Sequence, residues 1–212
     1  MTKFHRMGVS MALGVLLCAC AERPQQREIE LIVATLDVVP GMTVADVGAG
    51  SGRFTRALAQ RVGDSGTVYA SELGVERVEA LREAMAGQRN VVVVEATATA
   101  TGLPAACCDG ILLRGVYHHL TSPNETLEGL KRALKPGGRL LVVDFPPSIW
   151  LKPWTPQGIN ENRHGHGVTP DIVISEANAV GFEEVRLVEE WPTGWFTDLY
   201  GLLLRPVEHA QP

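Results

Sequence analysis

A short turn with alternating glycines is the part of this chain whose composition best suits chemistry. The apolar run Val44–Val47 contains Asp46 and is followed by Gly48, Gly50 and Gly52. Glycine permits positive φ angles and lets a ligand lie directly against the backbone. A helix is predicted to begin after the turn, and the first N–H groups of a helix attract anionic groups. The turn therefore predicts a site for a nucleotide-like cofactor.

The spacing of these glycines separates two cofactor classes. A dinucleotide-binding turn has the pattern G-x-G-x-x-G, and its third glycine would fall on Arg53. The segment Asp46-Val-Gly-Ala-Gly-Ser-Gly52 instead resembles motif I of the class I S-adenosylmethionine (SAM) methyltransferases, which is an acidic residue, one spacer and G-x-G-x-G. The resemblance implies SAM as the cofactor, with Asp46 and the three glycines among the residues that bind it.

The resemblance assigns further cofactor contacts downstream. A predicted strand at Thr67–Ser71 ends at Glu72, about 20 residues after the turn, where dinucleotide folds place the acid that binds the ribose hydroxyls. The methyltransferase family uses the same device, which assigns the ribose to Glu72. The acid that faces adenine in the family falls on Thr99, which is uncharged. The family also places residues that follow the fourth strand, beginning at Arg114, beside the cofactor and the acceptor.

Candidate acceptor contacts come from two segments. Methyl transfer from a sulfonium is an in-line displacement that mainly needs close approach in a dry pocket, and a base helps when the acceptor carries a proton. Tyr117, His119 and His164 are the residues predicted to contact the acceptor. His164 and His166 form an H-x-H pair that could ligate a metal, line the acceptor pocket or belong to a plain loop. The four cysteines form no metal pattern, and we predict no metal site.

A second hallmark of the same family is Leu134-Lys-Pro-Gly-Gly138, followed by an apolar strand that reaches Phe145. Together the two hallmarks imply a Rossmann-like three-layer α/β sandwich, with a mostly parallel seven-stranded sheet and an antiparallel C-terminal hairpin. The predicted domain spans residues 27–205. Within it, residues 145–169 are rich in Pro and Gly and are predicted to be an insertion that could cover the substrate.

Composition limits the partners. The chain has 212 residues and a formal net charge of −5, and it shows no basic stripe of the kind that nucleic-acid-binding proteins use. We therefore expect no nucleic-acid partner. The modest size and the lack of an added recognition domain favour a small-molecule acceptor.

The first 20 residues differ from the rest of the chain. Lys3 and Arg6 precede a largely apolar run that ends at Cys20, and this segment resembles a bacterial lipoprotein signal. The resemblance implies export and a membrane tether through a lipidated Cys20 on the periplasmic side. The alternatives are a true start nearer Met7 or Met11, or an apolar N-terminal helix, and the protein is then cytoplasmic.

These observations predict a SAM-dependent methyltransferase that acts on a small molecule. Two other functions stay open. A methyltransferase-like domain that binds a ligand or partner without catalysis would suit the uncharged Thr99 and the export signal. An NAD(P)-dependent oxidoreductase would suit the glycine turn alone.

Overall fold

The computed structural model describes residues 25–148, 153, 155, 158–159, 166–192 and 198–207. The predicted signal segment with Cys20, and His164, lie outside the described residues. Among the described residues, no helix combines the length and the apolar character needed to cross a membrane.

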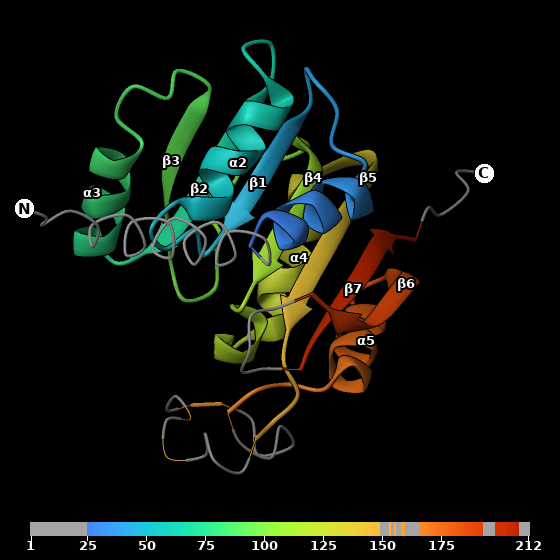
Figure 1. The fold of residues 1–212 in the computed structure, drawn as a ribbon. Coiled ribbons are helices and arrows are strands. Elements are labelled where there is room, and N and C mark those ends of the chain that lie inside the picture. The colour runs from blue at the N-terminus through green and yellow to red at the C-terminus, as the bar shows by residue number, and fades with distance from the viewer. Residues whose placement is uncertain are drawn as a thin grey trace, which may run out of the picture.

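The described chain forms a seven-stranded sheet in the order β3-β2-β1-β4-β5-β7-β6 (Figure 1). Strands β1 to β5 are parallel, whereas β7 runs antiparallel to both β5 and β6. The predicted fold class is confirmed, including the antiparallel C-terminal hairpin. The strands are β1 Thr43–Val47, β2 Thr67–Leu73, β3 Val91–Ala96, β4 Cys108–Arg114, β5 Leu134–Asp144, β6 Phe182–Trp191 and β7 Leu199–Pro206.

Helices cover both faces of this sheet (Figure 1). Adjacent strand residues point to opposite faces, so that Val44 packs in one buried cluster with Ile32 and Leu58, while Ala45 packs in another with Leu127. Both faces are buried, as expected for a parallel sheet. The helices occupy residues 25–35, α2 Arg53–Val62, α3 Val75–Ala84, the 3₁₀ turn η1 Tyr117–His119, α4 Pro123–Ala133 and α5 Pro170–Ala179.

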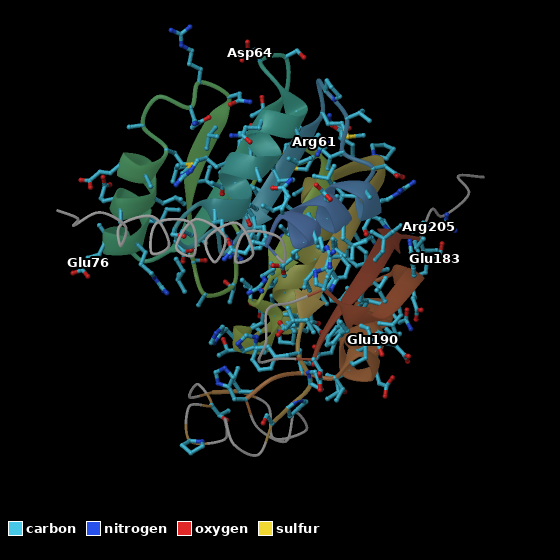
Figure 2. The ribbon with its side chains drawn as sticks, in the orientation of Figure 1. Arg61, Asp64, Glu76, Glu183, Glu190 and Arg205 are labelled. Carbon is cyan, nitrogen blue, oxygen red and sulfur yellow. The ribbon has the colours of Figure 1, made fainter. Side chains whose placement is uncertain are left out.

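The C-terminal hairpin of β6 and β7 forms the edge of the sheet opposite β3. Glu183 of β6 faces Arg205 of β7 in register, and the Arg205 Nε donates to Glu183 Oε1 at 2.6 Å (Figure 2). Both side chains are exposed, so this ion pair adds little stability. The buried side chains of Phe182 and Leu204 hold the hairpin against α5.

The strand order positions the functional site. The chain runs outward from β1 to β2 and β3, then returns to place β4 on the other side of β1. Loops that leave β1 and β4 therefore diverge, and in open α/β sheets ligands bind at the carboxyl ends of the strands at this switch point.

Candidate active site

A cavity of about 550 Å³ lies at the switch point, at the carboxyl ends of β1, β2, β3 and β4. This volume is within the range of roughly 300–1,000 Å³ that is typical of small-molecule sites. Its walls come from the glycine turn, the end of β2, the loop after β3 and the segment from Gly115 to Thr121. The cavity is thus formed by the loops that the sequence predicted to bind the cofactor.

The three glycines of the turn have positive φ angles but different surroundings. An added Cβ at Gly50 would meet no atom within 4 Å, so bare backbone faces the cavity there. A Cβ at Gly48 would overlap the Val116 side chain, which packs closely on the turn. A Cβ at Gly52 would overlap Met85, the C-cap residue of α3. Gly48 and Gly50 line the cavity, whereas Gly52 is the N-cap of α2 and allows it to pack on α3.

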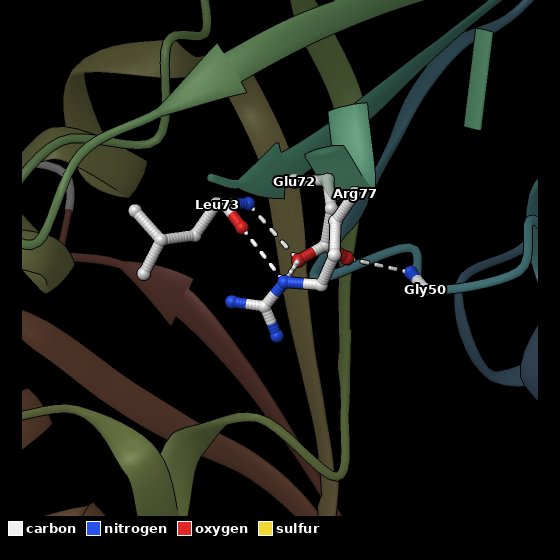
Figure 3. A network of polar contacts seen from close by, with 4 residues as sticks. All are labelled: Gly50, Glu72, Leu73 and Arg77. Carbon is white, nitrogen blue, oxygen red and sulfur yellow. Dashed lines mark hydrogen bonds and ion pairs between the residues drawn. The ribbon is translucent and has the colours of Figure 1, made fainter. Parts of the chain in front are cut away.

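The Glu72 carboxylate lies on the cavity wall and is held by backbone donors from two segments (Figure 3). Gly50 N–H donates to Oε2 at 2.7 Å, and Leu73 N–H donates to Oε1 at 2.9 Å. The Arg77 Nε lies 3.7 Å from Oε1 and donates to the Leu73 carbonyl. A carboxylate has about four lone-pair sites, so two hydrogen bonds leave capacity for a diol. The structure therefore presents this acid to the cavity in a fixed orientation.

Asp46 has a different environment although it lies next to the last residue of the neighbouring strand β1. Its side chain is 2% exposed and accepts a hydrogen bond of 2.6 Å from the Thr55 hydroxyl of α2. Burial raises the pKa of Asp46 to about 6. The residue does not line the cavity. Asp46 instead joins β1 to α2 beneath the glycine turn.

In the loop after β3, the threonines that line the cavity are not Thr99, the one predicted to contact adenine. Residues 97–100 form a turn in which Thr97 N–H donates to the Ala100 carbonyl at 2.7 Å and the Thr97 hydroxyl accepts from Ala100 N–H. Thr97, Ala100 and the buried Thr101 line the cavity, while Thr99 is exposed and lies outside the wall. The family resemblance located the loop, but the turn determines which threonines line the cavity.

Arg114 is engaged away from the cavity wall. Its Nε donates to Glu28 Oε1 at 3.0 Å, and Glu28 Oε2 lies 3.8 Å from Arg53. Both guanidinium groups lie over the Phe54 ring, at 4.4 Å for Arg53 and 5.6 Å for Arg114. Glu28 is 4% exposed, so this cluster joins the helix at residues 25–35 to the start of α2 and the end of β4.

Of the predicted acceptor contacts that the structure describes, Tyr117 is buried and His119 lines the cavity. Tyr117 is fully buried, and its hydroxyl donates to Glu176 Oε2 of α5 at 2.7 Å, so it does not line the cavity. His119 lines the cavity. Partial burial, followed by the neighbouring rings of His118 and His166, lowers the pKa of His119 to about 4. The His119 ring is therefore neutral at pH 7.

His118 and Asp144, which were not among the predicted site residues, complete this side of the site. His118 is 4% exposed, and its Nδ1 lies 2.8 Å from Oδ1 of Asp144, which is fully buried at the end of β5. The rings of His118, His119 and His166 lie together, with centroids 4.0 to 5.6 Å apart. The sequence signal for this contact was the adjacent pair His118-His119 after β4, together with Asp144 at the end of the next strand, β5. His166 could only be placed by the fold.

The comparisons with known proteins agree with this geometry. Residues 45–142 match the model of the family described as "Methyltransferase domain". A "Ubiquinone/menaquinone biosynthesis C-methyltransferase UbiE" from Legionella pneumophila (strain Lens) is 31% identical over 121 residues, which cover 55% of this chain and 48% of that protein. The chain thus spans about half the length of the curated relatives it matches.

Solved structures share the fold over most of the chain. A SAM-dependent methyltransferase from Aquifex aeolicus superposes with a TM-score of 0.68 at 27% identity, covering 83% of this chain and 88% of that one. The [4+2]-cyclase SpnF gives a TM-score of 0.67 at 16% identity, covering 85% and 81%, and shows likeness of fold alone. The match of residues 45–142, the strand order and the superposition on the Aquifex aeolicus structure together show that this chain has the Rossmann-like fold of the class I methyltransferases.

Proposed function

We propose that this chain transfers a methyl group from SAM to a small-molecule acceptor in the cavity at the carboxyl ends of β1 to β4. One observation carries the proposal: the bare backbone at Gly50 and the oriented carboxylate of Glu72 face the same cavity and are joined by a 2.7 Å hydrogen bond. Bare backbone admits a ligand closely, and the carboxylate suits paired hydroxyl donors. These residues therefore fit an adenosyl cofactor.

The cofactor side would work by binding and orientation. When bound, SAM supplies a methyl group on a positively charged sulfur. Glu72 would accept hydrogen bonds from the ribose hydroxyls, while Gly48 and Gly50 allow close approach at the turn. The buried Thr101 offers a hydroxyl on the wall where the family places its adenine contact. Because the reaction mainly needs alignment, fixed groups of this kind account for most of what the protein must do.

The acceptor side would orient the incoming nucleophile. His119 lines the same cavity as Glu72, and its ring is neutral at pH 7 because its pKa is lowered to about 4. A group with this pKa is a weak general base, since an efficient one titrates near the working pH. His119 is suited instead to accept a hydrogen bond from an acceptor O–H or N–H and so to hold it in line.

Cofactor binding tests the proposal most directly. Calorimetry on the full chain, purified in detergent, should show saturable binding of SAM and none of NADH. Glu72→Gln should weaken SAM binding about tenfold, or about 1.4 kcal/mol, because the amide presents one acceptor atom where the carboxylate presents two. Thr99→Ala is the matched control and should bind as the wild type does, because Thr99 lies outside the cavity wall.

Calorimetry together with a methyl-transfer assay separates the other two functions. Binding of NADH without SAM would establish the oxidoreductase. Intact SAM binding without turnover across a panel of acceptors would establish a non-catalytic binding domain. The panel should begin with quinone-class acceptors, because the curated relative is named as a ubiquinone/menaquinone biosynthesis C-methyltransferase.

We also propose that the protein is exported and tethered to a membrane through Cys20. The support is the sequence of residues 1–20, with its basic start, its apolar run and its cysteine. Mass spectrometry of the protein from bacterial membranes should find a diacylated Cys20 as the first residue. An unmodified protein that retains residues 1–20 in the soluble fraction would contradict the tether.

A further inference from the structure

Three histidines from two distant segments form a cluster, and one of them, His119, lines the cavity. His118 and His119 lie in η1 after β4, and His166 lies in the segment before α5. One ring nitrogen from each lies within 4.8 Å of one in both of the others. Among the described residues, this is the one group of metal-ligating side chains that comes together in this way.

Backbone contacts hold His166 in the cluster. The His166 carbonyl accepts from Ser148 N–H at 3.4 Å, and Val168 N–H donates to the Phe145 carbonyl at 2.9 Å. Gly167 between them has φ +124°, and an added Cβ would lie 2.8 Å from the Pro146 carbonyl oxygen. A glycine is therefore required for residues 166–168 to run against the chain that leaves β5. This pairing places the His166 ring beside those of η1.

A buried carboxylate orients the cluster from behind. Asp144 Oδ1 lies 2.8 Å from His118 Nδ1, while Oδ2 accepts from the His118 backbone N–H at 3.1 Å. Oδ1 also accepts from Phe145 N–H at 2.9 Å. Metal-bound histidines commonly donate the second ring N–H to a carboxylate, which fixes the tautomer and the ring. With Nδ1 bonded to Asp144, His118 keeps Nε2 as the nitrogen that could ligate a cation.

We propose that His118, His119 and His166 bind one divalent transition-metal cation of the zinc class, with Asp144 orienting His118. Neutral imidazoles suit Zn²⁺, Cu²⁺ and Ni²⁺, whereas Mg²⁺ and Ca²⁺ prefer oxygen. Zinc–nitrogen bonds of about 2.0–2.1 Å place tetrahedral ligand atoms about 3.3 Å apart. Ring movements of about 1.5 Å or less would bring the nitrogens from their present spacing to that distance.

The site would be open on the cavity side. Three protein ligands leave a fourth position for water or substrate, as in catalytic rather than structural zinc sites. His119 lines the cavity that also contains Glu72, so this position would face the acceptor. With the cation bound, the His119 lone pair would ligate it, and the cation would take over from His119 the contact with the acceptor. This consequence rests on the proposed function, and it identifies the acceptor class as molecules with a hydroxyl or thiol that can coordinate the cation.

Metal titration of the full chain tests the site without cofactor or acceptor. After treatment with a chelator, the wild type should bind one equivalent of Zn²⁺, and Co²⁺ should give the visible absorption of a four-coordinate nitrogen site. His166→Ala should weaken binding at least 100-fold, and Asp144→Asn should weaken it about 10–100-fold through loss of orientation. Tyr117→Phe is the control on the same turn and should bind Zn²⁺ as the wild type does.

A thermal melt and a SAM titration of each variant serve as controls for the metal titration. A variant that melts and binds SAM like the wild type is folded, so its loss of Zn²⁺ reports on the cluster. The inference is overturned if the folded wild type binds neither Zn²⁺ nor Co²⁺ more tightly than ~10 μM, a binding free energy near 7 kcal/mol. It is equally overturned if His166→Ala retains wild-type affinity. Failure to bind SAM with Zn²⁺ binding intact would refute the proposed function alone.

Discussion

The two ends of the cavity are built in contrasting ways. At the glycine turn, the Gly50 N–H donates to the Glu72 carboxylate on the cavity wall, and the two groups come from the turn after β1 and from the adjacent strand β2. On the other side, the imidazole rings of His118 and His119 from η1 contact the ring of His166. The buried Asp144 carboxylate contacts the His118 ring. The first end offers shape and hydrogen-bond acceptors. The second offers nitrogen lone pairs, which suit an acceptor group or a cation.

Each end also contains a buried aspartate at the carboxyl end of a strand, and their partners differ. Asp46 of β1 pairs with the hydroxyl of Thr55. Asp144 of β5 pairs with the His118 ring and with two backbone N–H groups. Asp46 therefore supports a turn, whereas Asp144 orients a side chain that could bind a ligand.

Blocking the turn should have the largest effect. Gly50→Val would project a branched side chain into the cavity, since no atom lies within 4 Å of the added Cβ, and SAM affinity should fall about 1,000-fold, or about 4 kcal/mol. Gly63→Val is the matched control, because Gly63 has a similar φ of +67° and equally open space but lies at the far end of α2. Calorimetry that finds equal losses in both variants would show that strain, not blockage, is the cause.

The raised pKa of Asp46 should make the free energy of unfolding depend on pH. Its folded pKa of about 6 exceeds the ordinary value of 3.8, so between these values the native state holds a proton that the unfolded state has released. The free energy of unfolding therefore falls as pH rises through this window, by about 3 kcal/mol at 1.36 kcal/mol per pKa unit. Asp46→Asn should lack this fall when urea denaturation is compared with the wild type at pH 4 and pH 7. Parallel curves for the two proteins would refute the assignment.

The smallest effect should come from Tyr117, on the histidine side. Tyr117→Phe removes a hydrogen bond to Glu176 and should lower the free energy of unfolding by about 1 kcal/mol. SAM affinity and the KM for the acceptor should be unchanged, because Tyr117 does not line the cavity. A fall in kcat at unchanged stability would contradict this expectation and support the predicted contact between Tyr117 and the acceptor.

The glycine side was largely predictable because its determinants are local. Alternating glycines, an acid that ends the next strand and a Pro-Gly-Gly turn each constrain backbone that is contiguous in sequence, and together they carried the family resemblance that implied the fold class. Glu72 was predicted and lies on the cavity wall. Thr99 and Arg114 were predicted to bind the cofactor, but Thr99 lies at an exposed turn and Arg114 pairs with Glu28.

The sequence by itself determined the backbone frame: φ angles that only glycine adopts readily, and apolar periodicity that places strands and helices. Tertiary structure alone decided which side chains meet. His166 joins His118 because residues 166–168 pair with the chain after β5, and Asp144 reaches the same ring from 26 residues away. Contacts of this kind depend on how separate segments pack, and no local spacing encodes them.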